Sequence, residues 1–170
     1  MIALKTIFAQ IENSMSEKDF IPSSYITLKE EGIVGYTSPS NIALVKYWGK
    51  RENQIPANPS ISFTLAACMT KTSVEYKKKI RKDNEFSFDL FFEDQPKEEF
   101  KPKIKTFLKR IEKYLPFLKE YHLVIKTSNT FPHSSGIASS ASGMSALALC
   151  FMEMERPFSA PITDDFFNNK

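Results

Sequence analysis

The sequence predicts a mixed α+β domain, with mostly antiparallel strands and with helices packed on one face of the sheet. Apolar and polar residues alternate over 61–69 and 86–92, a pattern typical of strands that bury one face. Over 100–115 the apolar residues instead recur at helical spacing. The chain has 170 residues, 42% of them hydrophobic, which is enough to bury the core of one domain.

The N-terminal part combines one short helix with extended stretches. Residues 1–17 predict an amphipathic helix, because the following apolar residues fall at helical spacing: Leu4, Ile7, Phe8, Ile11 and Met15. The stretch 32–48 is rich in β-branched and aromatic residues, and Pro39 marks a turn or an edge strand within it. A strand is predicted over 61–69. Its apolar face consists of Ile61, Phe63, Leu65 and Ala67.

The middle of the chain predicts a β-hairpin and the clearest helix. The stretches 72–80 and 85–93 look like hairpin arms around "RKDN". The second arm has a strictly alternating apolar face, formed by Phe86, Phe88, Leu90 and Phe92. The helix over 100–115 tolerates Pro102 in its first turn and is ended by Pro116. Its apolar stripe comprises Phe100, Ile104, Phe107, Leu108, Ile111 and Leu115.

The C-terminal part predicts a strand, a loop and a helix in succession. "YHLVIKT", residues 121–127, is the strand, and 138–154 is a helix built from Ala, Leu and Met. Two prolines then interrupt the pattern, and Thr163 is a candidate N-cap for a further helix.

Composition excludes several classes of function. The formal net charge of +3 suits an anionic small molecule and lacks the concentrated basic face of a nucleic-acid-binding protein. The chain has neither a secretory signal pattern nor an apolar stretch of about 18 residues, so no membrane partner and a cytoplasmic location are expected. Cys68 and Cys150 follow no metal or redox spacing and are predicted to be buried, reduced thiols.

The loop "NTFPHSSGIASSASG", residues 129–143, carries the first candidate site. A strand, a turn with glycine and hydroxyls, and then a helix form the geometry in which backbone N–H groups and the helix dipole meet an anion. Gly136 allows a close approach to phosphate or a positive φ. Three hydroxyls are placed to bond phosphate oxygens or Mg²⁺, those of Ser139, Ser140 and Ser142. On the residues alone, a serine-capped helix after an ordinary loop is an equal alternative, since neither nucleotide-binding glycine motif is present.

The second unusual segment is "SPSNIALVKYWGKRENQIPANPSISFTL", residues 38–65. It combines the single tryptophan with cations and two polar side chains, namely Trp48, Lys46, Lys50, Arg51, Asn41 and Asn58. By itself, an aromatic beside lysines is typical of a strand edge with snorkelling side chains.

Together, "NIALVKYWGKR", "NPSISFTL" and the serine loop resemble the GHMP small-molecule kinase superfamily and, within it, the mevalonate diphosphate decarboxylases. The resemblance covers roughly residues 35–165. It implies a ribosomal protein S5 domain 2-like fold, an antiparallel-rich sheet with helices packed on one face. The expected organisation is an N-terminal extension over 1–31 and a GHMP-type N-terminal lobe over 32–170, with the C-terminal lobe absent.

The resemblance implies ATP-dependent decarboxylation of (R)-5-diphosphomevalonate to isopentenyl diphosphate, a step of isoprenoid biosynthesis in the mevalonate pathway. The 3-hydroxyl would be phosphorylated, and CO₂ and phosphate would then be lost. The implied cofactors are ATP and Mg²⁺, the implied partner is an anionic small-molecule substrate, and the full-length protein is expected to be a homodimer. Bound diphosphate and triphosphate groups also require cations on physical grounds alone.

By motif position, Lys50 is the expected catalytic cation and Asn41 a polar contact near the 3-hydroxyl. Lys46, Tyr47 and Arg51 are expected on the substrate side, although packing or a salt bridge suits Arg51 and Trp48 equally well.

Ser139 and Ser140 are expected to meet the ATP phosphates, with Ser140 also catalytic and a ligand of the Mg²⁺ that accompanies ATP. The rest of the nucleotide loop would be shaped by Ser134, Ser135 and Gly136. His133 either donates to a phosphate or is an incidental loop residue, and His122 is expected to face solvent from a strand. Two isolated histidines argue against a metal site made by the protein alone.

Two functional elements of the family have no match in this sequence: a "GSGSACRS"-like segment with its arginine, and a later aspartate that deprotonates the 3-hydroxyl. The chain is therefore expected to be an N-terminal portion, inert by itself, with an exposed apolar face. The alternatives are a GHMP kinase that does not decarboxylate, which "KYWGK" disfavours, and a non-catalytic domain with the GHMP fold.

Overall fold

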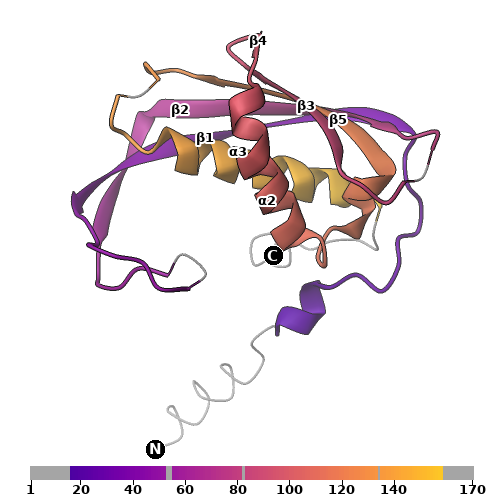
Figure 1. The fold of residues 1–170 in the computed structure, drawn as a ribbon, viewed down its shortest axis with the longest axis horizontal. Coiled ribbons are helices and arrows are strands. Elements are labelled where there is room, and N and C mark those ends of the chain that lie inside the picture. Colours follow the sequence, from indigo (N-terminus) through magenta and orange to yellow (C-terminus); the bar gives the residue numbers. More distant parts are fainter. Residues whose placement is uncertain (1–15, 53–54, 82, 134, 159–170) are drawn as a thin grey trace, which may run out of the picture.

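The computed structural model describes residues 16–52, 55–81, 83–133 and 135–158. These residues form a sheet with helices on it (Figure 1). The strands are β1 Glu31–Val45, β2 Ile61–Lys78, β3 Ser87–Phe92, β4 Gln95–Pro96 and β5 Tyr121–Asn129. The helices are α2 Lys101–Ile111 and α3 Ser139–Glu155, with the short 3₁₀ helices η1 Glu17–Phe20, η3 Glu98–Phe100 and η4 Pro116–Glu120.

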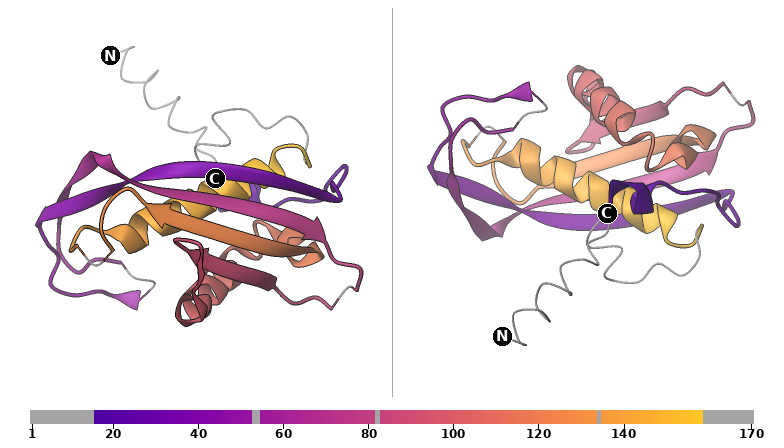
Figure 2. Two further views of the ribbon diagram at one scale, coloured as in Figure 1. Left: turned by 90° about the horizontal axis from the view of Figure 1, so that it is seen from above. Right: turned by 90° about the horizontal axis from the view of Figure 1, so that it is seen from below.

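The sheet has the strand order β1-β2-β5-β3-β4. Neighbouring strands are antiparallel except β3 and β5, which are parallel and are connected through α2. Parallel strands need such a crossover because the chain must return to the same end of the sheet. Both α2 and α3 lie on one face of the sheet (Figures 1 and 2), which confirms the predicted antiparallel-rich α+β class.

The predicted hairpin between 72–80 and 85–93 is wrong. Both stretches contain strands, but β5 lies between them, antiparallel to β2 along one edge and parallel to β3 along the other. The inward residues Leu123 and Ile125 of β5 are each only 1% exposed. The strand with the most completely buried apolar face thus occupies the middle of the sheet, a placement that closeness in sequence does not indicate.

The strand predicted over 61–69 continues into the first predicted hairpin arm, so β2 is one long strand. From Thr70 onward its residues alternate between buried and more exposed positions. Its first part is not covered by the described chain, since Ile61 and Phe63 are 58% and 55% exposed. The alternation therefore predicted this strand correctly but did not predict that its apolar face would be exposed.

β1 is an edge strand, as Pro39 indicated, and its pairing with β2 shifts beside that proline. Pro39 pairs with Met69, whereas the next residue, Ser40, pairs with Leu65. Residues 66–68 of β2 are thereby left without partners on β1 and form a β-bulge. The paired strands beyond this bulge, residues 40–45 and 61–65, are called the outer ribbon below.

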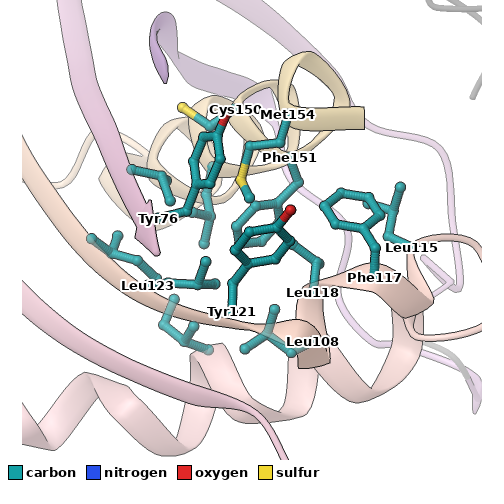
Figure 3. Packing of buried hydrophobic residues seen from close by; sticks show 14 of the residues in the cluster. Tyr76, Leu108, Leu115, Phe117, Leu118, Tyr121, Leu123, Cys150, Phe151 and Met154 are labelled. Atoms are coloured by element: carbon teal, nitrogen blue, oxygen red, sulfur yellow. The ribbon is translucent and has the colours of Figure 1, made fainter. Parts of the chain in front are cut away.

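The hydrophobic core lies between the sheet and the helices (Figure 3). Tyr76 of β2 and Tyr121 of β5 meet edge to face, with ring centroids 5.3 Å apart. Phe151 of α3 stacks on Phe107 of α2 at a centroid distance of 6.3 Å. The first contact joins two strands and the second joins the two helices, while α3 itself packs on β1 and β2, which fixes where its N-terminus points.

Both predicted helices in the described residues are present. α2 carries Pro102 in its first turn but ends at Ile111, four residues before the predicted end, so Pro116 starts η4 and does not itself end α2. α3 begins and ends within one residue of the predicted 138–154. Apart from Ser16 and Glu17, the N-cap and the first residue of η1, the helix predicted over 1–17 lies outside the described residues, as does the one predicted from Thr163. No helix in the described ranges is long and apolar enough to cross a membrane.

Residues 16–30, which precede β1, lie against the core. The ring of Tyr25 meets Phe117 edge to face with centroids 5.2 Å apart, and the Tyr25 hydroxyl donates to Oε1 of Glu155 at 3.3 Å. The backbone N–H of Ile26 donates to the carbonyl oxygen of Phe158 at 2.8 Å. The boundary between an extension and a lobe at residue 31 stays a prediction.

Both cysteines are free thiols. Cys150 is fully buried, and burial raises the pKa of its thiol to about 11. Cys68 is only partly buried. The prediction of buried reduced thiols is therefore confirmed for Cys150 and only in part for Cys68.

Candidate functional site

The loop from β5 to α3, residues 130–138, is attached at its start to the β-bulge. Thr130 donates its backbone N–H to the carbonyl oxygen of Met69 at 2.9 Å. Its hydroxyl accepts the N–H of Met69 at 2.9 Å and donates to the carbonyl oxygen of Ala67 at 3.0 Å. Backbone groups of the bulge thus find their partners in the loop, and the loop leaves the sheet at a fixed point.

Gly136 lies in this loop with φ +80°, which confirms that the position needs a positive φ. A Cβ atom added there would meet nothing within 4 Å. The requirement for glycine is therefore conformational, and the surrounding space is open to solvent.

The N-terminus of α3 is not capped by a serine. Its N-cap residue is Ala138, which supplies no side-chain cap, and the first turn contains no acidic residue. The alternative of a serine-capped helix is therefore wrong. The partial positive charge of this helix end has no acidic side chain from its own first turn to balance it, which favours an anion at this place.

The serines of the first turn face in different directions. Ser140 is exposed and Ser139 is half-buried, so a ligand bound beside the loop can reach both hydroxyls. Ser135, within the loop, is also exposed. Ser142 is only 2% exposed, and its Oγ lies 2.6 Å from Oγ1 of Thr70. The prediction that Ser142 can bond phosphate is therefore wrong, because its hydroxyl is used inside the core. Ser134 lies outside the described residues.

A cavity of about 130 Å³ opens beside the first turn of α3. Its polar side is formed by Thr70, Thr72, Lys103, Thr127, Asn129, Ser139 and Ser140. Its apolar side includes Leu90, Phe92, Phe100, Ile104, Met144 and Leu147. The imidazole of His133 also lines the cavity, with its centroid 5.0 Å from the ring of Phe92 and 6.1 Å from that of Phe100. An apolar wall beside an uncapped helix end suits a ligand with a flat ring and an anionic group.

The structure brings Asn41 to this helix end. Asn41 lies on the outer ribbon, and its carbonyl oxygen accepts the backbone N–H of Ala138 at 3.2 Å. Two segments that are far apart in the sequence, the "SPSNIAL" strand and the serine loop, are therefore in direct contact. This contact agrees with their assignment to one site.

The remaining predicted site residues lie in the connection between β1 and β2. Lys46, Tyr47, Lys50 and Arg51 are exposed there, and Trp48 is 94% exposed. The connection is held by bonds between its own residues, including one from the Trp48 N–H to Oδ1 of Asn58 at 2.8 Å. Nζ of Lys50 lies 5.6 Å from the centroid of the Tyr47 ring. Figures 1 and 2 show this connection and the N-terminus of α3 at the same end of the sheet.

The other histidine does not belong to this end of the molecule. His122 lies on β5 and is partly exposed. Its Nδ1 is 2.7 Å from the hydroxyl of Ser87, and its Nε2 is 3.3 Å from a carboxylate oxygen of Asp89. No group of acidic, histidine or cysteine residues that could hold a metal occurs in the described part of the chain.

One group of buried polar residues was not identified from the sequence. Under the N-terminal half of α3, the inward positions of β1 and β2 carry hydroxyls in place of apolar side chains. These buried strand residues and Ser142 of α3, which lies against them, are called the hydroxyl layer below: Ser38, Ser40, Thr70, Thr72 and Ser142. The pattern that could have revealed them is a pair of hydroxyl residues two positions apart in each strand, which share one face.

An antiparallel-rich sheet with helices on one face, and a glycine- and serine-containing loop that opens an uncapped helix, define an α+β domain of the GHMP-kinase type. A family model described as "Diphosphomevalonate decarboxylase-like N-terminal domain" matches residues 38–161. The chain belongs to this family.

Individual relatives agree with this assignment. The diphosphomevalonate decarboxylase of Bos taurus is 33% identical over 131 residues, covering 68% of this chain and 32% of the relative. The solved structure of mevalonate diphosphate decarboxylase from Trypanosoma brucei is 32% identical, with a TM-score of 0.57, over 80% of this chain and 36% of that chain.

A second similar solved structure is that of the mevalonate diphosphate decarboxylase from Enterococcus faecalis. It is described as showing the mevalonate diphosphate mediated ATP binding mechanism of that enzyme. It is 26% identical, with a TM-score of 0.55, over 74% of this chain and 43% of that one. The matched part of the chain covers only about a third of the length of the Bos taurus relative described above.

Proposed function

We propose that this chain provides the ATP-binding part of a diphosphomevalonate decarboxylase, which converts (R)-5-diphosphomevalonate to isopentenyl diphosphate with use of ATP. The observation that carries the proposal is the uncapped N-terminus of α3, which follows the Gly136 turn and is contacted by Asn41. The names of the relatives support the same reaction. The protein would act in isoprenoid biosynthesis in the cytoplasm.

In this proposal the phosphates of ATP bind at the first turn of α3. The accessible hydroxyls of Ser139 and Ser140 and the backbone around Ser135 and Gly136 would hold them, together with the residue at position 134. ATP carries Mg²⁺, and Ser140 would supply one oxygen ligand to it. The open cavity beside the helix offers an apolar wall for the remainder of the nucleotide.

The anionic substrate would bind on the side of the β1–β2 connection. Lys46, Lys50 and Arg51 supply positive charge there, and Tyr47 supplies an aromatic hydroxyl. We assign Lys50 as the catalytic cation, because phosphoryl transfer between two anionic groups depends on neutralising their charge. Asn41 would contact the 3-hydroxyl, and Ser140 would act at the transferred phosphate.

The organisation of the whole protein is part of the proposal. Residues 1–31 would form an extension and 32–170 the N-terminal lobe, with a second lobe supplying the arginine and aspartate that have no match here. The full-length protein would be a homodimer without a nucleic-acid partner.

Paired product measurements test this function. The purified 170-residue chain, and the same chain continued through a family C-terminal lobe, are incubated with ATP, Mg²⁺ and diphosphomevalonate while ADP and CO₂ are followed together. We expect neither product from the short chain and equal amounts of both from the long one. ADP without CO₂ from the long chain would identify a kinase instead, and turnover by the short chain would contradict the need for a second lobe.

A further inference from the structure

A chain of hydrogen bonds runs beneath the helix end proposed to bind ATP. The Thr70 hydroxyl donates to Oδ1 of Asn129, the last residue of β5, at 2.8 Å. Oγ1 of Thr70 is also 2.6 Å from Oγ of Ser142 in α3. Ser142 in turn reaches the carbonyl oxygen of Ser139 at 3.1 Å. One side chain of β2 thus connects the start of the serine loop to the first turn of α3.

The Thr70 and Ser142 hydroxyls have one proton each for these contacts. If Thr70 donates to Asn129, Ser142 donates the short bond to Thr70, and the Ser139 carbonyl oxygen is a second acceptor for that same Ser142 proton. Thr70 and Ser142 are each only 2% exposed, which means that water does not replace either partner. Buried hydrogen bonds of this kind are directional and are costly to break.

The geometry of the helix gives this bond a consequence for the ligand site. Ser142 follows Ser140 by two residues, which places their side chains about 200° apart around the helix axis. When Ser142 is held against Thr70, Ser140 must face away from the sheet, and it is exposed. An apolar pair at 70 and 142 would fill the same space but would leave the rotation of this turn less defined.

We propose that Thr70 and Ser142 are positioning residues, which hold the first turn of α3 in the rotation that presents its N–H groups and Ser140 to an anion. This inference rests on the proposed binding of ATP at that turn. Ser142 does not line the cavity and acts only through the orientation of the helix end, whereas Thr70 lines the cavity and also holds Ser142.

The test compares three variants with a matched control. Thr70→Val removes the central hydroxyl, Ser142→Ala removes its donor, and Thr70→Ser restores a hydroxyl. The control is Val74→Ala, because Val74 is also fully buried on β2 but has no hydrogen-bonding side chain and does not line the cavity. Melting temperature and the Kd for Mg·ATP are measured by calorimetry for each purified chain.

We expect Thr70→Val to raise the Kd about 3- to 10-fold, the range that loss of one hydrogen bond produces. Ser142→Ala should have a smaller effect, and the double variant should lose no more than Thr70→Val, since both changes break one connected unit. Thr70→Ser should restore binding. Val74→Ala should lower the melting temperature without changing the Kd. Equal effects of Thr70→Val and Val74→Ala on the Kd, or an unchanged Kd in Ser142→Ala, would overturn the inference.

Hydrogen exchange separates this inference from the proposed function. If the parent chain binds no Mg·ATP, the proposed function fails, and the ligand-free protein decides the positioning role. Faster exchange of the amides of residues 142–146 in Thr70→Val than in Val74→Ala supports it. The same rates in both variants overturn it.

Discussion

The two halves of α3 meet the sheet through different chemistry. The C-terminal half buries Phe151 and Met154 against aromatic rings, as Figure 3 shows for Tyr76 and Tyr121. The N-terminal half instead lies over the hydroxyl layer, where the Thr70–Ser142 bond is the shortest contact between side chains. One helix is therefore fixed in place by burial at one end and in rotation by directional bonds at the other.

Because of this difference, we expect the C-terminal half of α3 to contribute mainly to the stability of the domain and the N-terminal half mainly to ligand binding. Apolar contacts are strong but tolerate small rotations of a helix, because they have no preferred direction. Hydroxyl pairs add little net stability, yet they select one rotation. The predicted ligand residues lie at the end with hydroxyl pairs, so substitutions at the two ends should differ in what they change.

The largest effect is expected from Phe151→Ala, which removes a fully buried ring stacked on Phe107. The free energy of unfolding should fall by about 3–5 kcal/mol because a cavity is left in the core. Urea unfolding followed by circular dichroism measures this. The matched control is Phe63→Ala on the outer ribbon, where the ring is 55% exposed and the loss should stay below about 1 kcal/mol. Similar losses of unfolding free energy in the two variants would contradict the expectation that the buried C-terminal half of α3 stabilises the fold more than the outer ribbon does.

A smaller effect on stability, but a direct effect on binding, is expected from Gly136→Ala. The positive φ of this residue makes any Cβ unfavourable by about 1–2 kcal/mol, although the space around it is open. Calorimetry should show weaker Mg·ATP binding together with a lower melting temperature.

Gly35→Ala is the control for Gly136→Ala. Its added Cβ would lie 3.6 Å from the carbonyl oxygen of Thr72, an ordinary contact, and no positive φ is involved. Unchanged Mg·ATP binding is therefore expected for Gly35→Ala. Unchanged binding by Gly136→Ala would show that this turn does not shape the site.

The smallest effect, with the opposite sign, is expected from Ser40→Ala. Ser40 is fully buried, and its Oγ has no hydrogen-bond partner among the residues that the structure describes. Removing an unpaired buried hydroxyl should raise the free energy of unfolding by about 1 kcal/mol. Ser142→Ala is the comparison, because it deletes a paired hydroxyl of the same layer and should lower stability. If Ser40→Ala also lowers the urea midpoint, the presence or absence of a hydrogen-bond partner does not explain how these two hydroxyls affect stability.

The sequence predicted those elements whose periodicity is local. Both helices and the strands around Phe88 and Leu123 follow directly from apolar spacing, and the turn at Gly136 follows from glycine among hydroxyls. The hairpin failed because β5, more than 30 residues downstream of the β2 end, takes the position beside β2. Such pairing depends on which faces can be buried together, and short-range patterns do not contain that information.

Within the candidate site, the serine loop was predictable and its support was not. The strand–loop–helix order located Ser139 and Ser140, but Ser142 was assigned to the ligand although it faces the sheet. Thr70 was missed because a polar residue in a strand is normally interpreted as facing solvent. The contact of Asn41 with Ala138 lies just beyond the bulge in β2, and no feature of the sequence indicated either the contact or the bulge.

The length of β2 has a consequence for how the domain opens. One strand, Ile61–Lys78, crosses from the exposed outer ribbon to the centre of the core, with the bulge between the two parts. Apart from the fully buried Ser40, the ribbon carries large apolar side chains that are exposed, and a two-stranded ribbon with so little covered surface is only marginally stable in water. The outer ribbon should therefore separate from the sheet at a small fraction of the free energy needed to unfold the core, so a single strand belongs to two cooperative units. Because Asn41 lies on that ribbon and bonds Ala138, each such separation would also release one side of the helix end proposed to bind ATP.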